Sequence, residues 1–166
     1  AGKPGMNSKG VGMAVNGMYS MNDDWTRIKK PFHIRCYEAL RSSNMEMALE
    51  SLVGTPRSCT ANFILGHSPK YAIDVELAPD NLRLIEPKEG ILSHANHFVD
   101  PNVLGESEPP NPRRHFSEFR QKRMELLLNE KKPLDISGIQ NILKDHENHP
   151  QSLCRHRDNI LPASQH

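Results

Sequence analysis

The chain has few of the residues that build a large hydrophobic core. Of its 166 residues, 36% are hydrophobic and 5% are aromatic, with one tryptophan, whereas ordinary domains are roughly 45–50% apolar when glycine is included. The sequence has no run of 18 apolar residues, as a membrane-spanning helix would require. A chain of this length corresponds to about one domain. The lean composition favours either a loop-rich small domain or part of a domain whose other core residues lie elsewhere.

Cysteine is scarce, and neither sign of charge is in excess. Cys36, Cys59 and Cys154 are widely spaced and form no CxxC pair, which argues against a structural zinc site and favours free thiols in a reducing compartment. We therefore expect a cytoplasmic protein without a metal or cofactor. The formal net charge of +1 provides no overall field for nucleic acid or acidic lipid, so we expect neither of these partners. The chain opens on Ala1 and contains no signal peptide.

Helical and strand patterns are present, and they are segregated along the chain rather than alternating. Segregated elements predict an α+β fold with antiparallel sheet and argue against a parallel, Rossmann-type fold. Asn44 and Asp135 have the positions of helix N-caps, and Gly54 has that of a helix stop. The predicted strands cover 9–19, 59–66, 71–78, 81–87 and 90–98, the predicted helices cover 31–43, 45–53, 113–130 and 135–146, and residues 100–113 are expected to form an extended loop.

Five segments, in order between residues 2 and 156, carry more specific information. They read GMNSKGVGMAVNGM, SCTANFILG followed by AIDVELAP, GILSHANHF, RQKRMELLL, and KDHENHPQSLCRH. Each segment resembles a motif of the isopenicillin N acyltransferase-like family, that is, the acyl-coenzyme A:6-aminopenicillanic acid acyltransferase family of N-terminal-nucleophile hydrolases. A single match would be weak, but five matches in the same order are specific.

The resemblance implies a fold and a chemistry. Members of the family have a four-layer αββα fold and are made as autoproteolytic precursors that cut themselves before a cysteine. The freed cysteine supplies both the thiol nucleophile and the α-amine base for amide hydrolysis or acyl transfer through a thioester. The implied partners are the remainder of the precursor chain, a small amide substrate and an acyl-coenzyme A donor, and no cofactor is implied.

The chain departs from the family pattern at both ends. The family's nucleophile lies upstream of the glycine-rich strand, so we expect 1–166 to be an internal or C-terminal part of a single domain, inactive as a fragment. The family's active-site arginine lies just beyond the CR motif, where RHRDNILPASQH gives no clear match. The alternative function is therefore a degenerate, non-catalytic relative that acts as a binding or structural protein.

Two asparagines are the candidate catalytic residues. Asn96 matches the family asparagine that donates its side-chain amide to the oxyanion, a task that suits a fixed neutral donor. Asn16 is a weaker candidate, because related amide hydrolases have an active-site asparagine near the end of this strand. The ordinary alternatives are that Asn96 bonds its own backbone at a strand end and that Asn16 is a turn residue before Gly17.

Other chemistry-bearing residues receive structural interpretations. His94 and His97 have the spacing of metal ligands only on a helix; on a strand they point to opposite faces, so we expect packing or surface roles. None of the three cysteines is N-terminal, and none is expected to be the nucleophile. The basic and aromatic stretch 113–123 has its phenylalanines at helical core spacing, which indicates an amphipathic helix rather than a nucleic-acid site.

Overall fold

The computed structural model describes residues 4–156 except 28, 55 and 68–70. The chain divides into two compact units, 1–112 and 113–166. The first contains an antiparallel five-stranded sheet with helices, and the second is helical. The predicted α+β class with antiparallel sheet is therefore confirmed. The four-layer αββα arrangement stays a prediction, since one sheet is present among the described residues.

The sheet of the first unit is built from consecutive antiparallel neighbours. Each strand pairs with the next, and the register places Asn16 opposite Asn62 and Asn62 opposite Glu76. Residues opposite each other in a ladder share a face of the sheet, so these three polar side chains lie in one row. The strands are β1 (Gly5–Met6), β2 (Val11–Gly17), β3 (Ala61–His67), β4 (Tyr71–Leu77) and β5 (Leu82–Ile85).

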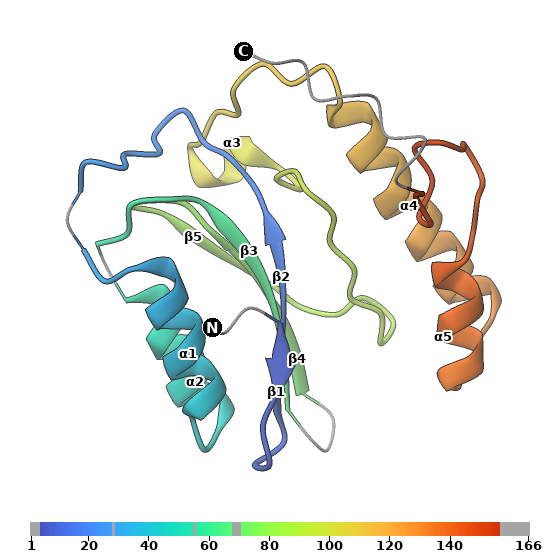
Figure 1. Ribbon diagram of the computed structural model, residues 1–166, viewed down its shortest axis with the longest axis horizontal. Helices are drawn as coiled ribbons and strands as arrows, with labels where there is room; N and C mark the ends of the chain where they lie inside the picture. Colours follow the sequence, from blue (N-terminus) through green and yellow to red (C-terminus); the bar gives the residue numbers. More distant parts are fainter. Residues whose placement is uncertain (1–3, 28, 55, 68–70, 157–166) are drawn as a thin grey trace. The chain divides into compact units, whose positions relative to one another are not determined.

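Two helices cover one face of this sheet (Figure 1). Pro31 precedes α1 (Phe32–Arg41), where its fixed φ suits a helix start. Asn44 caps α2 (Met45–Val53) by accepting a hydrogen bond from the Met47 amide, and Gly54 follows the last turn. Both predicted helices and the predicted cap are confirmed.

The covered face carries the apolar core. Alternate residues of β2, β3 and β4 point into it and meet the apolar sides of α1 and α2, as the period-2 and period-3.6 patterns predict. The cluster consists of Val11, Met13, Cys36, Ala39, Ala48, Leu52, Ala61, Phe63, Leu65, Ile73, Val75 and Leu77. The opposite face of the same strands therefore carries the intervening residues, including the row of Asn16, Asn62 and Glu76.

The segment after β5 differs from the sequence prediction. Residues 90–98 do not form a strand; they contain only the bridge partner Ile91, opposite Lys88, in a tight turn where Glu89 and Gly90 have positive φ. The strand prediction is wrong because side chains take the place of ladder partners. Asn16 donates to the His94 carbonyl, and the Phe98 amide donates to Glu108.

The predicted loop 100–113 contains a short helix, α3 (Pro101–Leu104). Asp100 caps it by accepting from the Asn102 amide at 3.1 Å, and Gly105 ends it with φ +68°. An Asp-Pro pair is a helix start, and one turn of helix suffices to redirect the chain. The predicted extended loop is therefore wrong at α3, and residues 106–111 form no helix or strand.

The second unit consists of two helices and a folded turn. Its helices are α4 (Arg114–Glu130) and α5 (Ile136–Leu143), and Asp135 caps α5 by accepting from the Gly138 amide at 2.7 Å. Arg123 of α4 bonds Asp145 with two nitrogens and also reaches Glu147 at 3.0 Å, which ties the turn after α5 to α4. Both predicted helices and the Asp135 cap are confirmed.

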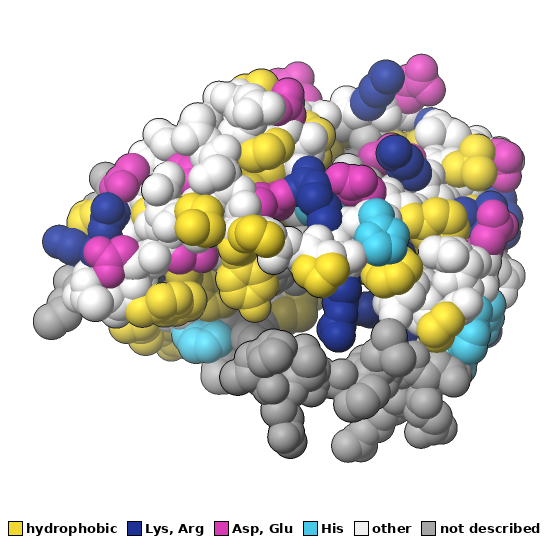
Figure 2. Space-filling model, turned by 90° about the horizontal axis from the view of Figure 1, so that it is seen from above, with side chains coloured by type: hydrophobic (Ala, Val, Ile, Leu, Met, Phe, Trp, Pro, Cys, Tyr) yellow, Lys and Arg dark blue, Asp and Glu magenta, His cyan; other side chains and the backbone are white. Residues whose placement is uncertain are grey.

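The described surface mixes charges of both signs. On the side seen in Figure 2, basic and acidic side chains are interspersed with apolar ones. Within the described residues, every helix is too short or too polar to cross a bilayer.

Candidate active site

The two candidate asparagines meet at the end of β2. The Asn16 amide nitrogen donates to the Asn62 side-chain oxygen at 2.9 Å and to the His94 carbonyl at 3.1 Å. Two residues further along the same segment, the Asn96 amide nitrogen donates to the Gly17 carbonyl at 3.1 Å. Asn96 is exposed, and Asn62 is fully buried. Residues that are 80 apart in sequence are thus held beside each other, as a shared site requires.

A buried network of titratable side chains lies directly behind the asparagines. His94 Nε2 is 3.0 Å from a Glu76 carboxylate oxygen and 3.9 Å from Asp74, and all three side chains are at most 1% exposed. His94 Nδ1 faces the Ala95 carbonyl at 3.0 Å, and Asn62 donates to the other oxygen of Asp74. Since both ring nitrogens face acceptors, the doubly protonated imidazolium satisfies both bonds.

The network shifts the acidity of its members. Burial raises the pKa of Asp74 to about 6, although the charge of His94 and the Asn62 hydrogen bond act in the opposite direction. Burial alone would lower the pKa of His94, but the hydrogen bond that His94 donates to Glu76 and the charge of Asp74 outweigh it and leave that pKa raised. The structure therefore favours a charged histidine between carboxyl groups, one of which is protonated more easily than usual.

We expect the free energy of unfolding to decrease as the pH rises from about 5 to about 7. Between the ordinary Asp74 pKa of 3.8 and its folded value of about 6, the folded state holds a proton that the unfolded state has released, so stability falls with rising pH. The loss between about pH 5 and about pH 7 should be about 1 kcal/mol from Asp74 alone. The raised pKa of His94 acts in the same direction at higher pH, because its stabilising proton is lost only there.

Denaturant unfolding at these two pH values checks the prediction. The isosteric variant Asp74→Asn should lose most of the difference between pH 5 and 7. Asp80→Asn is the matched control, because Asp80 is exposed and the Arg27 hydrogen bond lowers its pKa, so it titrates below this range. An unchanged pH dependence in Asp74→Asn would contradict the assignment.

A pocket of about 630 Å³ opens at the same end of the sheet. Asn16 and Gly17 line it from β2, Cys59 from the approach to β3, and Phe32 from the start of α1. Asn96 is not part of its wall, but its hydrogen-bond partner Gly17 is. A ligand in the pocket would lie against the end of β2. Asn16 is part of that wall, and Asn96 is hydrogen-bonded to Gly17, which is also part of it.

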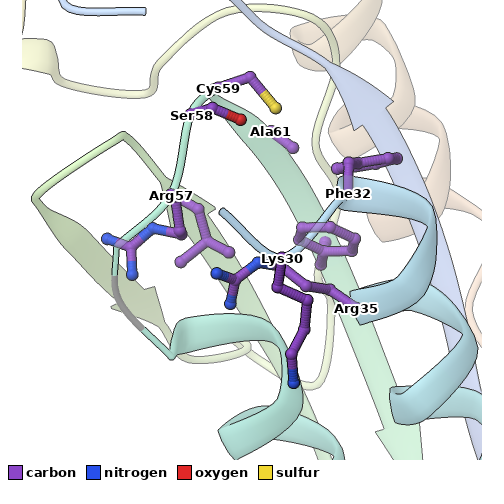
Figure 3. A pocket seen from close by; sticks show the side chains of 9 residues that line it. Lys30, Phe32, Arg35, Arg57, Ser58, Cys59 and Ala61 are labelled. Atoms are coloured by element: carbon purple, nitrogen blue, oxygen red, sulfur yellow. The ribbon is translucent and has the colours of Figure 1, made fainter. Parts of the chain in front are cut away.

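A much smaller hollow of about 10 Å³ adjoins this pocket and shares Phe32 and Cys59 with it (Figure 3). Two buried arginines line the hollow. Arg35 donates to carbonyls at the end of α2 and beyond, and Arg57 donates to the Ala78 carbonyl at 2.8 Å and the Asn81 carbonyl at 2.9 Å. Because burial lowers the pKa of both groups and their donors bond the backbone, these arginines stabilise the fold rather than bind substrate.

Cys36 and Cys59 lie in surroundings that do not activate a thiol. Cys36 is fully buried in the apolar core on α1. Burial, and to a lesser extent the charge of Asp23, raise the pKa of Cys59, whereas a nucleophilic cysteine needs a lowered one. Cys154 lies in the turn after α5 in the second unit.

His94 and the acidic residues of β4 are the part of the site that the sequence did not reveal. His94 was expected to have a packing or surface role; its side chain is buried, and both of its ring nitrogens face acceptors, which the sequence did not predict. Asp74 and Glu76 alternate with Ile73 and Val75, a pattern typical of a strand with a solvated face. The available signal was the row of polar residues that the register aligns across β2, β3 and β4.

Comparison with known proteins identifies one family. A family model described as acyl-coenzyme A:6-aminopenicillanic acid acyl-transferase matches residues 2–160. The match confirms the resemblance that the five sequence segments predicted and extends over both units of the chain. No curated protein gave a match. Residues 157–166, where the resemblance would locate the family's arginine, lie outside the described residues.

Proposed function

We propose that this chain, which belongs to the acyl-coenzyme A:6-aminopenicillanic acid acyltransferase family, is part of an enzyme that hydrolyses an amide bond or transfers an acyl group. The nucleophile in this proposal is an N-terminal cysteine on a segment outside the chain, released by self-cleavage. The 166 residues then supply one sheet of a four-layer domain, together with the oxyanion donor and one wall of the substrate site.

The reaction follows from these roles. The cysteine α-amine takes the thiol proton, and the sulfur attacks the substrate carbonyl to give a tetrahedral oxyanion. The Asn96 amide donates an N–H to that oxygen as its charge develops. The C–N bond then breaks, the amine leaves with the proton, and a thioester remains. Water or an amine attacks the thioester, which releases an acid or a new amide and restores the thiol.

One observation carries the proposal: Asn96 and Asn16 lie together at the end of β2, which also lines the 630 Å³ pocket. An oxyanion donor must be fixed before reaction, because reorientation during the reaction would cost free energy. The Gly17 carbonyl holds the Asn96 amide, and Asn16 holds the backbone two residues earlier through the His94 carbonyl. The segment is thereby anchored at two points to a strand of the sheet.

The pocket wall supports a substrate with an apolar acyl group and an anionic part. Trp25 and Phe32 provide aromatic surface, and Lys29 and His33 contribute basic side chains at the rim. Ligand sites of this size commonly combine apolar walls with a few polar groups that fix orientation. A small amide with a carboxylate, or an acyl-coenzyme A donor with its phosphates, has this combination.

Two unpaired atoms support the proposal that further parts of the protein cover the polar face of the sheet. Glu76 Oε2 and Arg83 Nη1 are buried and have no hydrogen-bond partner within the described part of the chain. Glu76 and Arg83 are opposite each other in the β4–β5 ladder, so they share this face. Folded proteins rarely leave buried polar atoms unpaired, and groups from the remaining segment of the domain would satisfy them.

A non-catalytic relative is the second candidate. Cys59, whose pKa is raised, and Cys36, which is buried, are unsuited to act as nucleophiles. If the complete protein has no N-terminal cysteine, this candidate is therefore favoured. The same pocket would then bind a ligand without turnover.

We expect all three cysteines of this chain to be dispensable for turnover. The complete protein is given an amide substrate, acid-quenched, and digested for mass spectrometry; the acyl group should be found on an N-terminal cysteine outside residues 1–166. Single variants Cys36→Ala, Cys59→Ser and Cys154→Ser should retain turnover, with folding checked by circular dichroism. An acyl group on one of these three residues would refute the assignment. So would a loss above about a thousandfold in a folded variant, toward the roughly 10⁶-fold loss of removing a nucleophile.

A further inference from the structure

The turn after α5 gathers three metal-binding side chains outside the site described above. His146, Cys154 and His156 each present one ligand atom, and these atoms lie within 4.8 Å of one another. The two Nε2 atoms of the histidines are 2.7 Å apart, and the Cys154 sulfur is 3.8 Å from His156 Nε2. Among the described residues, this is the one group of three histidine, cysteine or acidic side chains with such convergence.

We propose that His146, Cys154 and His156 bind a Zn²⁺ ion. In a tetrahedral zinc site, with bonds of about 2.0–2.1 Å to nitrogen and about 2.3 Å to sulfur, the nitrogens lie about 3.3 Å apart and nitrogen and sulfur about 3.6 Å apart. The observed Cys154 to His156 distance is close to that value. The histidine nitrogens need to separate by only about half an ångström, which a small ring rotation provides.

The backbone of the turn holds the ligands in place without the ion. The Cys154 amide donates to the Asp145 carbonyl at 2.9 Å, which closes the turn next to His146. Ser152 is fully buried and donates to the Cys154 carbonyl. Arg123 fixes Asp145 to α4. The ligands therefore come from a closed turn whose ends are already joined, and this lowers the ordering cost of binding.

The donor set selects the class of ion. Two imidazoles and one thiolate suit zinc and similar borderline cations and do not suit magnesium or calcium, which prefer oxygen. On binding, the Cys154 thiol releases its proton. In the His146–His156 hydrogen bond one Nε2 carries a proton, and that ring must carry its proton on Nδ1 instead when Nε2 binds the ion. Affinity therefore falls at acidic pH. The fourth position belongs to water or to His149, whose ring centre is 6.2 Å from that of His146 and 6.4 Å from that of His156.

The ion acts here as a clip for the turn rather than as a catalytic metal. It joins His146 to Cys154 and His156 near the end of the described chain. Asp145, next to His146, is itself held by Arg123. The ligands come from the second unit, whereas Asn16 and Asn96 belong to the first. The proposal does not depend on the amidase or acyltransferase function.

Cobalt binding tests the proposal directly, since Co²⁺ replaces Zn²⁺ and gives a thiolate-to-cobalt charge-transfer band. The complete protein should bind one Zn²⁺ per molecule by elemental analysis and show the cobalt band. Cys154→Ser should abolish the band, and Cys59→Ser, a cysteine of similar exposure, should keep it. His146→Asn and His156→Asn should each weaken zinc affinity by more than the roughly 10–100-fold typical of an outer-shell partner. His33→Asn, an exposed histidine on α1, should leave the affinity unchanged.

Circular dichroism in the metal-free state verifies that each variant is folded, which is expected because the two histidines are exposed. A rise in melting temperature on addition of zinc, present in the parent chain and absent in Cys154→Ser, gives a second readout. Failure of the folded parent chain to bind zinc at micromolar concentration would overturn the proposal. Persistence of the cobalt band in Cys154→Ser would do the same.

Discussion

Asn96→Ala should reduce kcat of the complete enzyme by about 10²–10³, equivalent to about 2.7–4 kcal/mol of transition-state stabilisation. The amide N–H gains most when the carbonyl oxygen becomes an oxyanion, so KM should stay within a few-fold. Asn96→Asp should be at least as damaging, because a carboxylate repels the developing charge. Steady-state kinetics on an amide substrate measures both parameters.

Folding and local geometry must be separated from chemistry in this experiment. Asn96 is exposed, and the variant loses its hydrogen bond to the Gly17 carbonyl, a loss of about 1 kcal/mol of stability. Asn129→Ala is the matched control, since this exposed asparagine also donates to a backbone carbonyl, that of Glu125. If Asn96→Ala retains more than half of the parent kcat, the oxyanion role is wrong, and Asn16 becomes the next residue to test.

His94→Ala should destabilise the fold by about 3–5 kcal/mol at neutral pH, the scale of removing one partner from a buried ion pair. The change leaves Asp74 and Glu76 facing each other's charge in a site that is at most 1% exposed. Glu76 keeps the Val99 amide as a donor at 2.7 Å, but its second oxygen already has no partner in the described chain. Denaturant unfolding with a fixed slope measures the loss.

The effect should shrink under acidic conditions, which distinguishes it from a simple cavity. Below about pH 5, Asp74 is mainly protonated even in the parent, because its pKa is raised to about 6, so less charge is left unpaired. His94→Gln, which retains a donor, should be milder than His94→Ala. His33→Ala, an exposed histidine on α1, should change stability by less than about 0.5 kcal/mol. An equal loss at both pH values would show that packing alone explains the effect.

Local patterns predicted the helices and the paired strands because these depend on neighbours in sequence. Asn44 and Asp135 cap their helices as their side-chain chemistry requires. The strands β2 to β5 follow the period-2 pattern, since one face of the sheet is apolar. Residues 90–98 escaped prediction because their hydrogen-bond partners are side chains from distant positions, namely Asn16 and Glu108.

The sequence by itself determined the family, through five ordered segments, and it identified Asn16 and Asn96 as candidates for one site. Only the tertiary structure decided that Asp74 and Glu76 are buried with His94. An alternating strand has the same sequence pattern whether its polar face meets water or another segment. Burial of that face is what raises the pKa of Asp74. Likewise, His146 and His156 are ten residues apart in sequence, and only the closed turn brings their ring nitrogens to 2.7 Å.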